Sequence, residues 1–438
     1  MTEPIAAPAF LNAACNRPPS KGKRILLAWE HGHNLGHISR LLAIASLVEA
    51  QGSEPVFALP TAFMQAPQLS ALPYARLASP LVQQSLAKPP SRIDSFADIL
   101  MSFGFGDALA LGQAVCAWAQ LFEAVRPDSV MLDYAPTAQL AAQLLQVPAF
   151  QITNGFDAPP ANCPIFGIAV RGPYLDQLNA RKLAQISAAF AKAGQTATGK
   201  TGPSLEAYFA HPTKVYDCIP ETDPYGPRGQ GTRDQGLYVG PLSNVGEAQA
   251  ASWPGKAEPP SFSASTGRSR SLFAYLRSAP EPDKWLSAMC RVDANTLCVW
   301  PDIPQELIDR HCNPRVNITR QPVDMGQALA RADAVLNYGS TTTVCQSLLA
   351  GKPQLMVPTD MEKVMVSRKV VLHGAGVMWQ RGKETPMEAV QQLLNDHTLA
   401  QAARAIATKY PLEQLQRNQL LFAQALTANC WIDKEKHP

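Results

Sequence analysis

The chain has 438 residues, of which 46% are hydrophobic and 17% charged, and its formal net charge is +3. This length exceeds one ordinary core, so two or three globular domains are expected, and the composition excludes a disordered chain. The small net charge provides no broad basic surface, so nucleic acid is not an expected partner.

Nine cysteines are scattered singly without a Cys-x-x-Cys pair, which favours buried thiols and a cytoplasmic protein. No uninterrupted run of about 18 apolar residues predicts a membrane-spanning helix, so membrane contact is expected to be peripheral at most. Residues 1–22 lack the apolar core of a signal peptide and are expected to form a loose tail.

The first half of the chain alternates between strand and helix patterns. An apolar run at 24–29 predicts a buried strand, and periodic apolar residues at 38–51 predict a helix that ends before Gly52. Further strands are predicted at 55–59, 129–132, 149–153 and 237–240, and further helices at 107–125, 137–145 and 174–193.

Residues 243–270 are rich in Ala, Ser, Gly and Pro and predict a linker. Beyond it, strands are predicted at 271–276, 296–300, 316–319 and 334–337, and helices at 283–291, 305–310, 325–332, 344–350 and 412–427. This alternation predicts two Rossmann-like α/β domains, at 23–242 and 271–408.

Residues 194–201, GQTATGKT, match the expression for a phosphate-binding P-loop. That motif requires a strand before the loop and a helix after it. Here an amphipathic helical pattern precedes the motif, and Pro203 follows it, so a flexible loop is predicted instead.

The segment 337–376 places small hydroxyl residues between a strand and a helix. Gly339 allows a turn, and the hydroxyls of Ser340, Thr341, Thr342 and Thr343 precede the helical pattern. A helix N-terminus of this kind suits a diphosphate. These residues alone are equally compatible with a plain helix cap.

Three histidines, His31, His33 and His37, lie in or near the loop after the first strand. Imidazoles at close spacing can bind zinc, but no carboxylate or cysteine stands at zinc-ligand spacing. No metal site is therefore predicted.

The segment NYGSTTTVCQSLLAGKP resembles the donor signature of GT-B glycosyltransferases related to family 1, the UDP- and macrolide glycosyltransferases. Gly339 and Thr343 match the family pattern His-Gly-Gly-x-Gly-Thr. Tyr338 stands at its histidine, and Ser340 and Thr342 replace glycines, so the donor motif is divergent.

The resemblance implies the remaining donor contacts. Gln346 replaces the Glu that holds the ribose, and Glu362 and Lys363 stand at the acidic pair that contacts the sugar. Pro322 and Val323 belong to a loop whose backbone meets the base. Arg277, after the first strand of this half, is a candidate counter-charge for the diphosphate, or else a solvated surface residue.

The segment LGHISRLLAIASLVEAQG resembles the Gly-His helix start on the acceptor side of these enzymes. By this resemblance His37 is the general base, Asp133 orients it, and Gly36 and Asn154 contact the acceptor. The alternatives are that His37 only orders its loop and that Asp133 caps the next helix.

The resemblance implies a GT-B fold, α/β with two Rossmann-like domains whose parallel sheets face a central cleft, and a final segment 409–438 that packs back on the first domain. It implies inverting, hexosyltransferase-like transfer from a UDP- or dTDP-sugar to a small-molecule or lipid hydroxyl, by a monomer or weak dimer, without cofactor or metal. A non-catalytic partner or regulator and a nucleotide-sugar epimerase remain alternatives.

Overall fold

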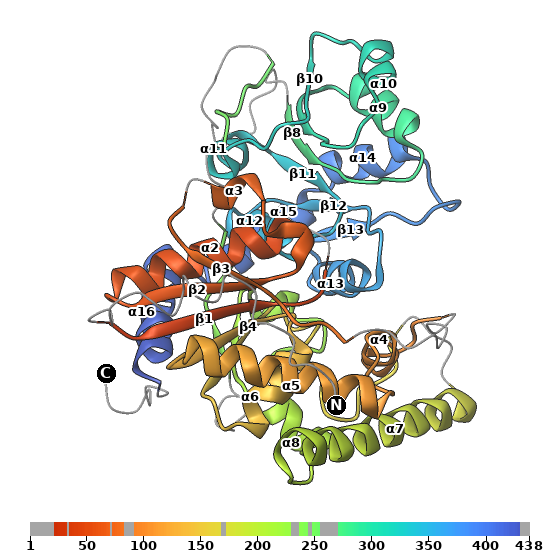
Figure 1. Cartoon of the computed structure of the whole chain (residues 1–438). Helices are drawn as coiled ribbons and strands as arrows, with labels where there is room; N and C mark the ends of the chain where they lie inside the picture. Colours follow the sequence, from red (N-terminus) through yellow and green to blue (C-terminus); the bar gives the residue numbers. More distant parts are fainter. Residues whose placement is uncertain are drawn as a thin grey trace. The chain divides into compact units, whose positions relative to one another are not determined.

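The computed structural model describes residues 22–32, 35–70, 72–82, 92–167, 172–228, 236–243, 248–254 and 270–429. The chain divides into two compact units (Figure 1). The first unit comprises Met1–Asp217, Arg228–Asn244 and Gln416–Pro438, and the second comprises Cys218–Pro227 and Val245–Leu415. Residues 218–227 thus cluster with the second unit, although the sequence pattern assigns 23–242 to one domain.

The first unit is built on a parallel sheet with the order β3-β2-β1-β4-β5-β6-β7. Its described strands are β1 (Arg24–Trp29), β2 (Glu54–Leu59), β3 (Ala75–Ala78), β4 (Ser129–Asp133), β5 (Ala149–Thr153), β6 (Thr213–Tyr216) and β7 (Leu237–Tyr238). The chain runs outward in both directions from β1 and β4, so the strand order reverses between these two strands. This reversal is the topological switch point of a doubly wound sheet.

The helices of this unit cover the sheet (Figure 1). They are α2 (Leu35–Ala50), η1 (Thr61–Phe63), α3 (Pro67–Ser70), α4 (Phe96–Ser102), α5 (Ala108–Val125), α6 (Pro136–Leu144), α7 (Pro173–Thr198), α8 (Leu205–Ala210) and most of α16 (Leu412–Ala428). On α16, Phe422 and Leu426 are buried in a core cluster with residues of β1 and α2. The Ser129 hydroxyl donates to the Leu426 carbonyl over 2.9 Å. The C-terminal helix therefore completes the core of the first unit.

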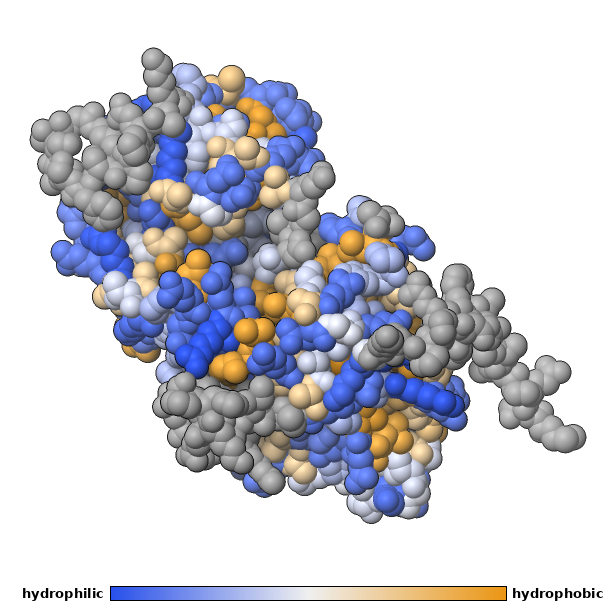
Figure 2. Space-filling view, turned by 90° about the vertical axis from the view of Figure 1, so that its left-hand side faces the viewer, coloured by the Kyte–Doolittle hydropathy of each residue, from blue (hydrophilic) through white to orange (hydrophobic). Residues whose placement is uncertain are grey.

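Helix α5 is, among the described helices, the one long and apolar enough in length and composition to cross a membrane. Its side chains Leu111, Trp118 and Phe122 are buried, and it packs against α6 and α7. One face of α5 is therefore packed within the first unit. On the face shown in Figure 2, hydrophilic residues predominate and hydrophobic residues form small separate groups.

Helix α7 runs through most of the P-loop-like sequence. It continues to Thr198 and ends at Gly199, whose φ of 70° is left-handed. Residues 194–198 are therefore helical, and the prediction of a flexible loop is wrong there. The helical pattern continues because Gln195 and Thr198 extend it without a breaker, and the glycine that ends it comes five residues later than expected. A helix, not a strand, precedes the lysine.

The second unit repeats the topology, with the order β10-β9-β8-β11-β12-β13 and parallel pairing throughout. Its strands are β8 (Arg270–Tyr275), β9 (Ala294–Val299), β10 (Val316–Thr319), β11 (Ala334–Asn337), β12 (Gln354–Met356) and β13 (Gly376–Met378). Its helices are η2 (Pro220–Thr222), α9 (Pro282–Arg291), α10 (Gln305–Arg310), α11 (Met325–Arg331), α12 (Thr341–Leu349), α13 (Met361–Leu372), α14 (Pro386–Asn395) and α15 (His397–Ala407). The switch point here lies between β8 and β11.

Candidate active site

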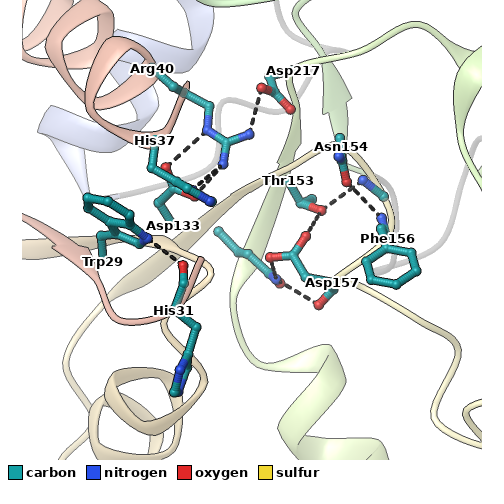
Figure 3. A network of polar contacts seen from close by, with 12 residues as sticks. Trp29, His31, His37, Arg40, Asp133, Thr153, Asn154, Phe156, Asp157 and Asp217 are labelled. Carbon is teal, nitrogen blue, oxygen red and sulfur yellow. Dashed lines mark hydrogen bonds and ion pairs between the residues drawn. The ribbon is translucent and has the colours of Figure 1, made fainter. Parts of the chain in front are cut away.

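The switch point of the first unit brings together the two residues predicted to be catalytic. In the register of β1 and β4, Trp29 lies opposite Asp133, the last residue of its strand. Helix α2 follows β1 and presents His37 from its first turn. The Nδ1 atom of His37 lies 2.8 Å from Oδ1 of Asp133 (Figure 3). Open α/β sheets bind ligands at this edge, so the pair stands where chemistry is expected.

Arg40 joins this pair from the next turn of α2, because residues three apart share one face of a helix. Its Nε donates to Oδ2 of Asp133 over 3.0 Å, and its Nη2 donates to Oδ1. Its Nη1 donates to Oδ2 of Asp217 over 2.8 Å. Asp217 directly follows β6 and is 2% exposed. Figure 3 shows the guanidinium between the two carboxylates.

The charges of this cluster support one another. Burial by itself would raise the pKa of Asp133, but the positive charge of Arg40 and the contact with His37 lower that pKa below its usual value. Burial works against the charged form of Arg40, whereas Asp133 and Asp217 raise the pKa of its guanidinium well above the ordinary value. Asp133 is therefore ionised and Arg40 charged at neutral pH.

Aromatic rings fix the orientation of the imidazole. The Trp29 ring stacks on His37 with centroids 4.9 Å apart, and the Tyr134 ring lies parallel to it at 6.3 Å. Gly32 adopts a φ of 100°, and a Cβ added there would lie 2.4 Å from Nε2 of His37. The loop before α2 thus passes so close to this nitrogen that no side chain fits.

Of the other two histidines of this loop, the structure describes His31. The His31 ring stacks on Phe103 with centroids 3.6 Å apart, and its Nε2 lies 3.8 Å from a carboxylate oxygen of Glu30. His33 lies outside the described residues. Within the described parts of the chain, no group of three or more His, Cys, Asp or Glu side chains could hold a metal ion.

The two residues predicted to contact the acceptor both belong to the first unit. Asn154 follows β5, is half-buried, and its Oδ1 accepts the backbone N–H of Phe156 over 3.0 Å. Gly36 is exposed in the first turn of α2. Close to Asn154, the carboxylate of Asp157 accepts hydrogen bonds from Thr153 and Gln151, and burial raises its pKa (Figure 3).

The switch point of the second unit is lined by neutral polar groups. Asn337 ends β11 opposite Tyr275 and is fully buried. Its Oδ1 accepts the N–H of Gly339 and its Nδ2 donates to Oε1 of Gln354, each over 2.8 Å. Gly339 adopts a φ of 83°, which a side chain would strain.

Helix α12 begins earlier than its apolar periodicity predicts, at Thr341 instead of residue 344. Ser340 is the N-cap, but its hydroxyl donates to Oγ1 of Thr343 over 2.9 Å and makes no capping bond to the backbone. Thr341 and Thr343 are buried, and Thr342 is half-buried. The hydroxyl residues therefore form the first helical turn, because hydroxyls near a helix N-terminus can bond within that turn.

Tyr338 and Lys363 come together beside this turn. The Tyr338 ring meets Tyr275 edge-on at 5.6 Å, and Nζ of Lys363 lies 5.6 Å from the Tyr338 centroid. Burial, followed by the neighbouring Tyr338, raises the pKa of Tyr275 to about 12, while the charge of Arg277 opposes this shift. Arg277 is half-buried. Two cations thus lie near the tyrosine pair.

The remaining predicted donor residues lie on two helices of the second unit. Glu362 and Lys363 belong to the first turn of α13, which Asp360 caps. Gln346 is half-buried on α12.

In the loop predicted to meet the base, Val323 is buried in a hydrophobic cluster. Pro322 is exposed, and its carbonyl accepts the N–H of Gln249 over 3.1 Å. The Val323 side chain packs in the core, so only the backbone of that residue is left to contact a ligand.

Three residues of the first site, Arg40, Asp217 and Gly32, are not predicted from the sequence. Arg40 could have been found, because it lies three residues after His37 on a predicted helix. Asp217 could not, because the four residues of β6 are too short to show a strand period. For Gly32 the only sequence indication was that the residue is a glycine.

No protein-family model matches the chain. Over 81 residues the chain is 33% identical to a zeaxanthin glucosyltransferase of Pseudescherichia vulneris. The matched segment is 18% of this chain and 20% of that protein. The chain therefore matches only one fifth of the length of this curated relative.

Solved structures resemble most of the chain in fold. CalG4, the calicheamicin glycosyltransferase, superposes with a TM-score of 0.63 at 16% identity, covering 93% of this chain and 98% of that one. The glycosyltransferase VinC in complex with dTDP superposes with a TM-score of 0.53 at 14% identity, covering 90% and 99%. With its two parallel-sheet α/β units, the chain has the fold of the GT-B glycosyltransferases, as the resemblance predicts.

Proposed function

We propose that the chain is an inverting glycosyltransferase that moves a sugar from a UDP- or dTDP-sugar to a hydroxyl of a small-molecule or lipid acceptor. The contact between His37 and Asp133 at the switch point of the first unit carries the proposal. The GT-B fold supports it by analogy, because the similar structures and the partial relative are glycosyltransferases by name.

His37 has the chemistry of a general base. When its Nδ1–H donates to Asp133, the lone pair of Nε2 is available to accept the proton of the acceptor hydroxyl. The ionised Asp133 then stabilises the imidazolium that forms. The acceptor oxygen attacks the anomeric carbon as the diphosphate leaves from the opposite side, so the configuration inverts.

The second unit supplies the donor site of this proposal. The N-terminus of α12 and the hydroxyls of Ser340 and Thr343 suit the diphosphate, and its negative charge increases as the sugar departs. Arg277 adds positive charge, whereas the ammonium of Lys363 is paired with the carboxylate of Asp360. The amide of Gln346 can bond a ribose hydroxyl, without the charge assistance of a carboxylate.

The divergent donor residues motivate a second candidate, a non-catalytic GT-B homologue that acts as partner or regulator. Tyr338 stands where the family has a histidine, and the observed contacts of its ring are with Tyr275 and Lys363. In that case the protein binds no nucleotide sugar. A nucleotide-sugar epimerase, the third candidate, would form an epimer in the absence of acceptor.

We also propose a cellular location, an oligomeric state and domain bounds for the protein. The described cysteines are free thiols, which supports a cytoplasmic location. The proposed oligomeric state is a monomer or weak dimer. We assign a tail at 1–22, an acceptor domain at 23–242, a linker at 243–270, a donor domain at 271–408 and a bracing helix within 409–438.

The decisive experiment combines donor binding with transfer. UDP-, dTDP- and GDP-sugars are screened by thermal shift, because a ligand of the native state raises its melting temperature. Transfer from the donors that bind is then followed by mass spectrometry. His37→Ala is expected to lower kcat by about 10³-fold with the Kd of the donor unchanged. The control His397→Ala, at an exposed position on α15, leaves both unchanged. Full turnover by His37→Ala would refute the role of this base.

A further inference from the structure

Four side chains form one continuous polar chain in the first unit. His37 contacts Asp133, Asp133 holds Arg40 through both carboxylate oxygens, and Arg40 reaches Asp217. The Asp133 side chain is fully buried, and those of Arg40 and His37 are 13% and 17% exposed. With a neutral imidazole these residues carry two negative charges and one positive charge.

We propose that Arg40 is a positioning residue of the His37–Asp133 pair, which orients the carboxylate and keeps the imidazole neutral until the acceptor reacts, and that Asp217 anchors Arg40 for this role. The inference rests on the proposed function for its catalytic meaning. The structural part, control of protonation at His37, can be measured without any activity.

The geometry selects one tautomer of His37. Nδ1 lies 2.8 Å from Oδ1 of Asp133 and 3.2 Å from Nη2 of Arg40. A guanidinium only donates and a carboxylate only accepts, so Nδ1 can serve one of them. The shorter contact is to the carboxylate, which places the proton on Nδ1 and leaves Nε2 as the base.

The same geometry restrains protonation of the second nitrogen. An unpaired buried carboxylate would hold a neighbouring imidazolium strongly. Here Arg40 occupies both oxygens of Asp133 and brings its own positive charge within 3.2 Å of the imidazole. Like charges at this distance repel in a partly buried site. Arg40 therefore offsets the attraction of Asp133 for the imidazolium.

Asp217 is suited to anchor this charge. Its Oδ2 accepts Nη1 of Arg40 over 2.8 Å, while its buried Oδ1 has no hydrogen-bond partner within the described residues. Replacement of Asp217 by asparagine can keep the oxygen that holds Arg40 and removes the negative charge. Such a variant changes the electrostatics of the cluster with little change in shape.

Besides Arg40, two titratable groups contact the imidazole, Asp133 through its carboxylate and Tyr134 through its parallel ring. The charges of Asp217 and Asp157 interact with the guanidinium of Arg40. Glu30 and His31, at the end of β1, lie beside each other. Only Arg40 brings a fixed positive charge into hydrogen-bond distance of Nδ1 within the described region. The sign of the shift on its removal is therefore set by the loss of that charge.

The test follows the imidazole of His37 by NMR in protein labelled with ¹³C at histidine Cε1, with His37→Gln to assign the signal. In Arg40→Gln the pH at which His37 takes up its second proton is expected to rise by about 1 unit. In Asp217→Asn this pH midpoint is expected to fall by about half a unit, because the positive charge of Arg40 is then no longer balanced by Asp217. Arg40→Lys keeps the charge and is expected to shift the midpoint least. Arg181→Gln, at an exposed arginine of α7, is the control and shifts nothing.

Midpoint shifts of opposite sign in Arg40→Gln and Asp217→Asn support the inference. If the two residues only maintained the local structure, the sign of the shift would not depend on which charge is removed. If Arg40→Gln does not fold, a downward shift in Asp217→Asn supports it and an unchanged or raised midpoint overturns it. The acidic limb of the kcat/KM profile should move with the NMR midpoint. NMR shifts without any sugar transfer would refute the proposed function and leave the electrostatic role of Arg40 standing.

Discussion

The two units share a strand topology but differ in the charge of their switch points. Between β1 and β4 lies a buried cluster of ionised groups, centred on Asp133 and Arg40. Between β8 and β11 the corresponding buried residue is Asn337, which binds neutral partners. The same backbone arrangement thus holds charged side chains in one unit and amides in the other.

This difference has a physical reason if the units divide the reaction as proposed. A histidine that accepts a proton becomes an imidazolium, which an ionised carboxylate beside it stabilises. A diphosphate brings its own negative charge, so its site benefits from helix N–H groups and is harmed by a buried anion. Substitutions at either switch point test this comparison.

The largest effect is expected from removing the charge of the first switch point. Asp133→Asn is expected to lower kcat by about 10³- to 10⁴-fold, because the amide stabilises neither the reactive tautomer nor the imidazolium. Arg40 is left with one carboxylate, and breaking a buried pair costs about 3–5 kcal/mol. Kinetics and urea unfolding test this.

Asp176→Asn is the control, since Asp176 is exposed in the first turn of α7. It should change neither quantity by more than a small amount. Wild-type kcat in Asp133→Asn would contradict the comparison.

The reciprocal change places a charge in the second switch point. Asn337→Asp is expected to weaken donor binding by about 2 kcal/mol, roughly thirtyfold, because a carboxylate several ångströms from the diphosphate repels it. Calorimetric titration with the donor measures this. Asn395→Asp, at an exposed end of α14, controls for the added charge. Equal affinity in Asn337→Asp would place the diphosphate elsewhere.

One glycine in each unit, Gly36 in the first and Gly339 in the second, tests whether the backbone beside the switch point tolerates a side chain. Gly339→Ala is expected to destabilise the protein by about 1–2 kcal/mol, because its φ is 83° and the added Cβ would lie 3.0 Å from Oγ of Ser367. Gly36→Ala meets open space and should stabilise α2 by about 0.5–1 kcal/mol. Denaturant unfolding distinguishes the signs, and equal effects would show that the two backbones do not differ in this way.

The smallest effect concerns two carboxylates that bond the starts of helices. Glu30 accepts the N–H groups of Thr137 and Ala138 over 2.9 and 2.6 Å, and burial raises its pKa to about 8 despite these bonds. Its folded-state pKa exceeds the unfolded value, so stability is fully present below about pH 4.5 and is lost as pH rises through 8. Glu30→Gln is therefore expected to gain a few degrees in melting temperature at pH 8.5 relative to pH 5.

Glu388 in the second unit provides the opposite sign. The backbone N–H of Thr385, then its hydroxyl, lower the pKa of this exposed carboxyl. Its stabilisation is present above the unfolded pKa and lost as pH falls through the lower, folded value. Glu388→Gln should therefore lower the melting temperature at neutral pH, with the difference fading in acid. The same sign for both variants would contradict the assigned roles of burial and hydrogen bonding.

Much of the architecture follows from local sequence patterns. The strand at 149–153 and the helix at 305–310 have the predicted bounds, because hydrophobic period and turn residues act over a few positions. The edge position of Asp133 was also predictable, since it follows an apolar run. Sequence patterns missed β3 and β6, two four-residue strands whose pairing with the sheet defines them.

The sequence by itself determined two doubly wound units, a histidine at the start of one helix and hydroxyl residues at the start of another. Only the tertiary structure decided that Arg40 lies between carboxylates 93 and 177 residues away, that Gly32 passes against the imidazole, and that Glu362 and Lys363 lie in a helix. The reason is that periodicity is a local property, whereas the partner of a buried charge is decided by which strand ends meet.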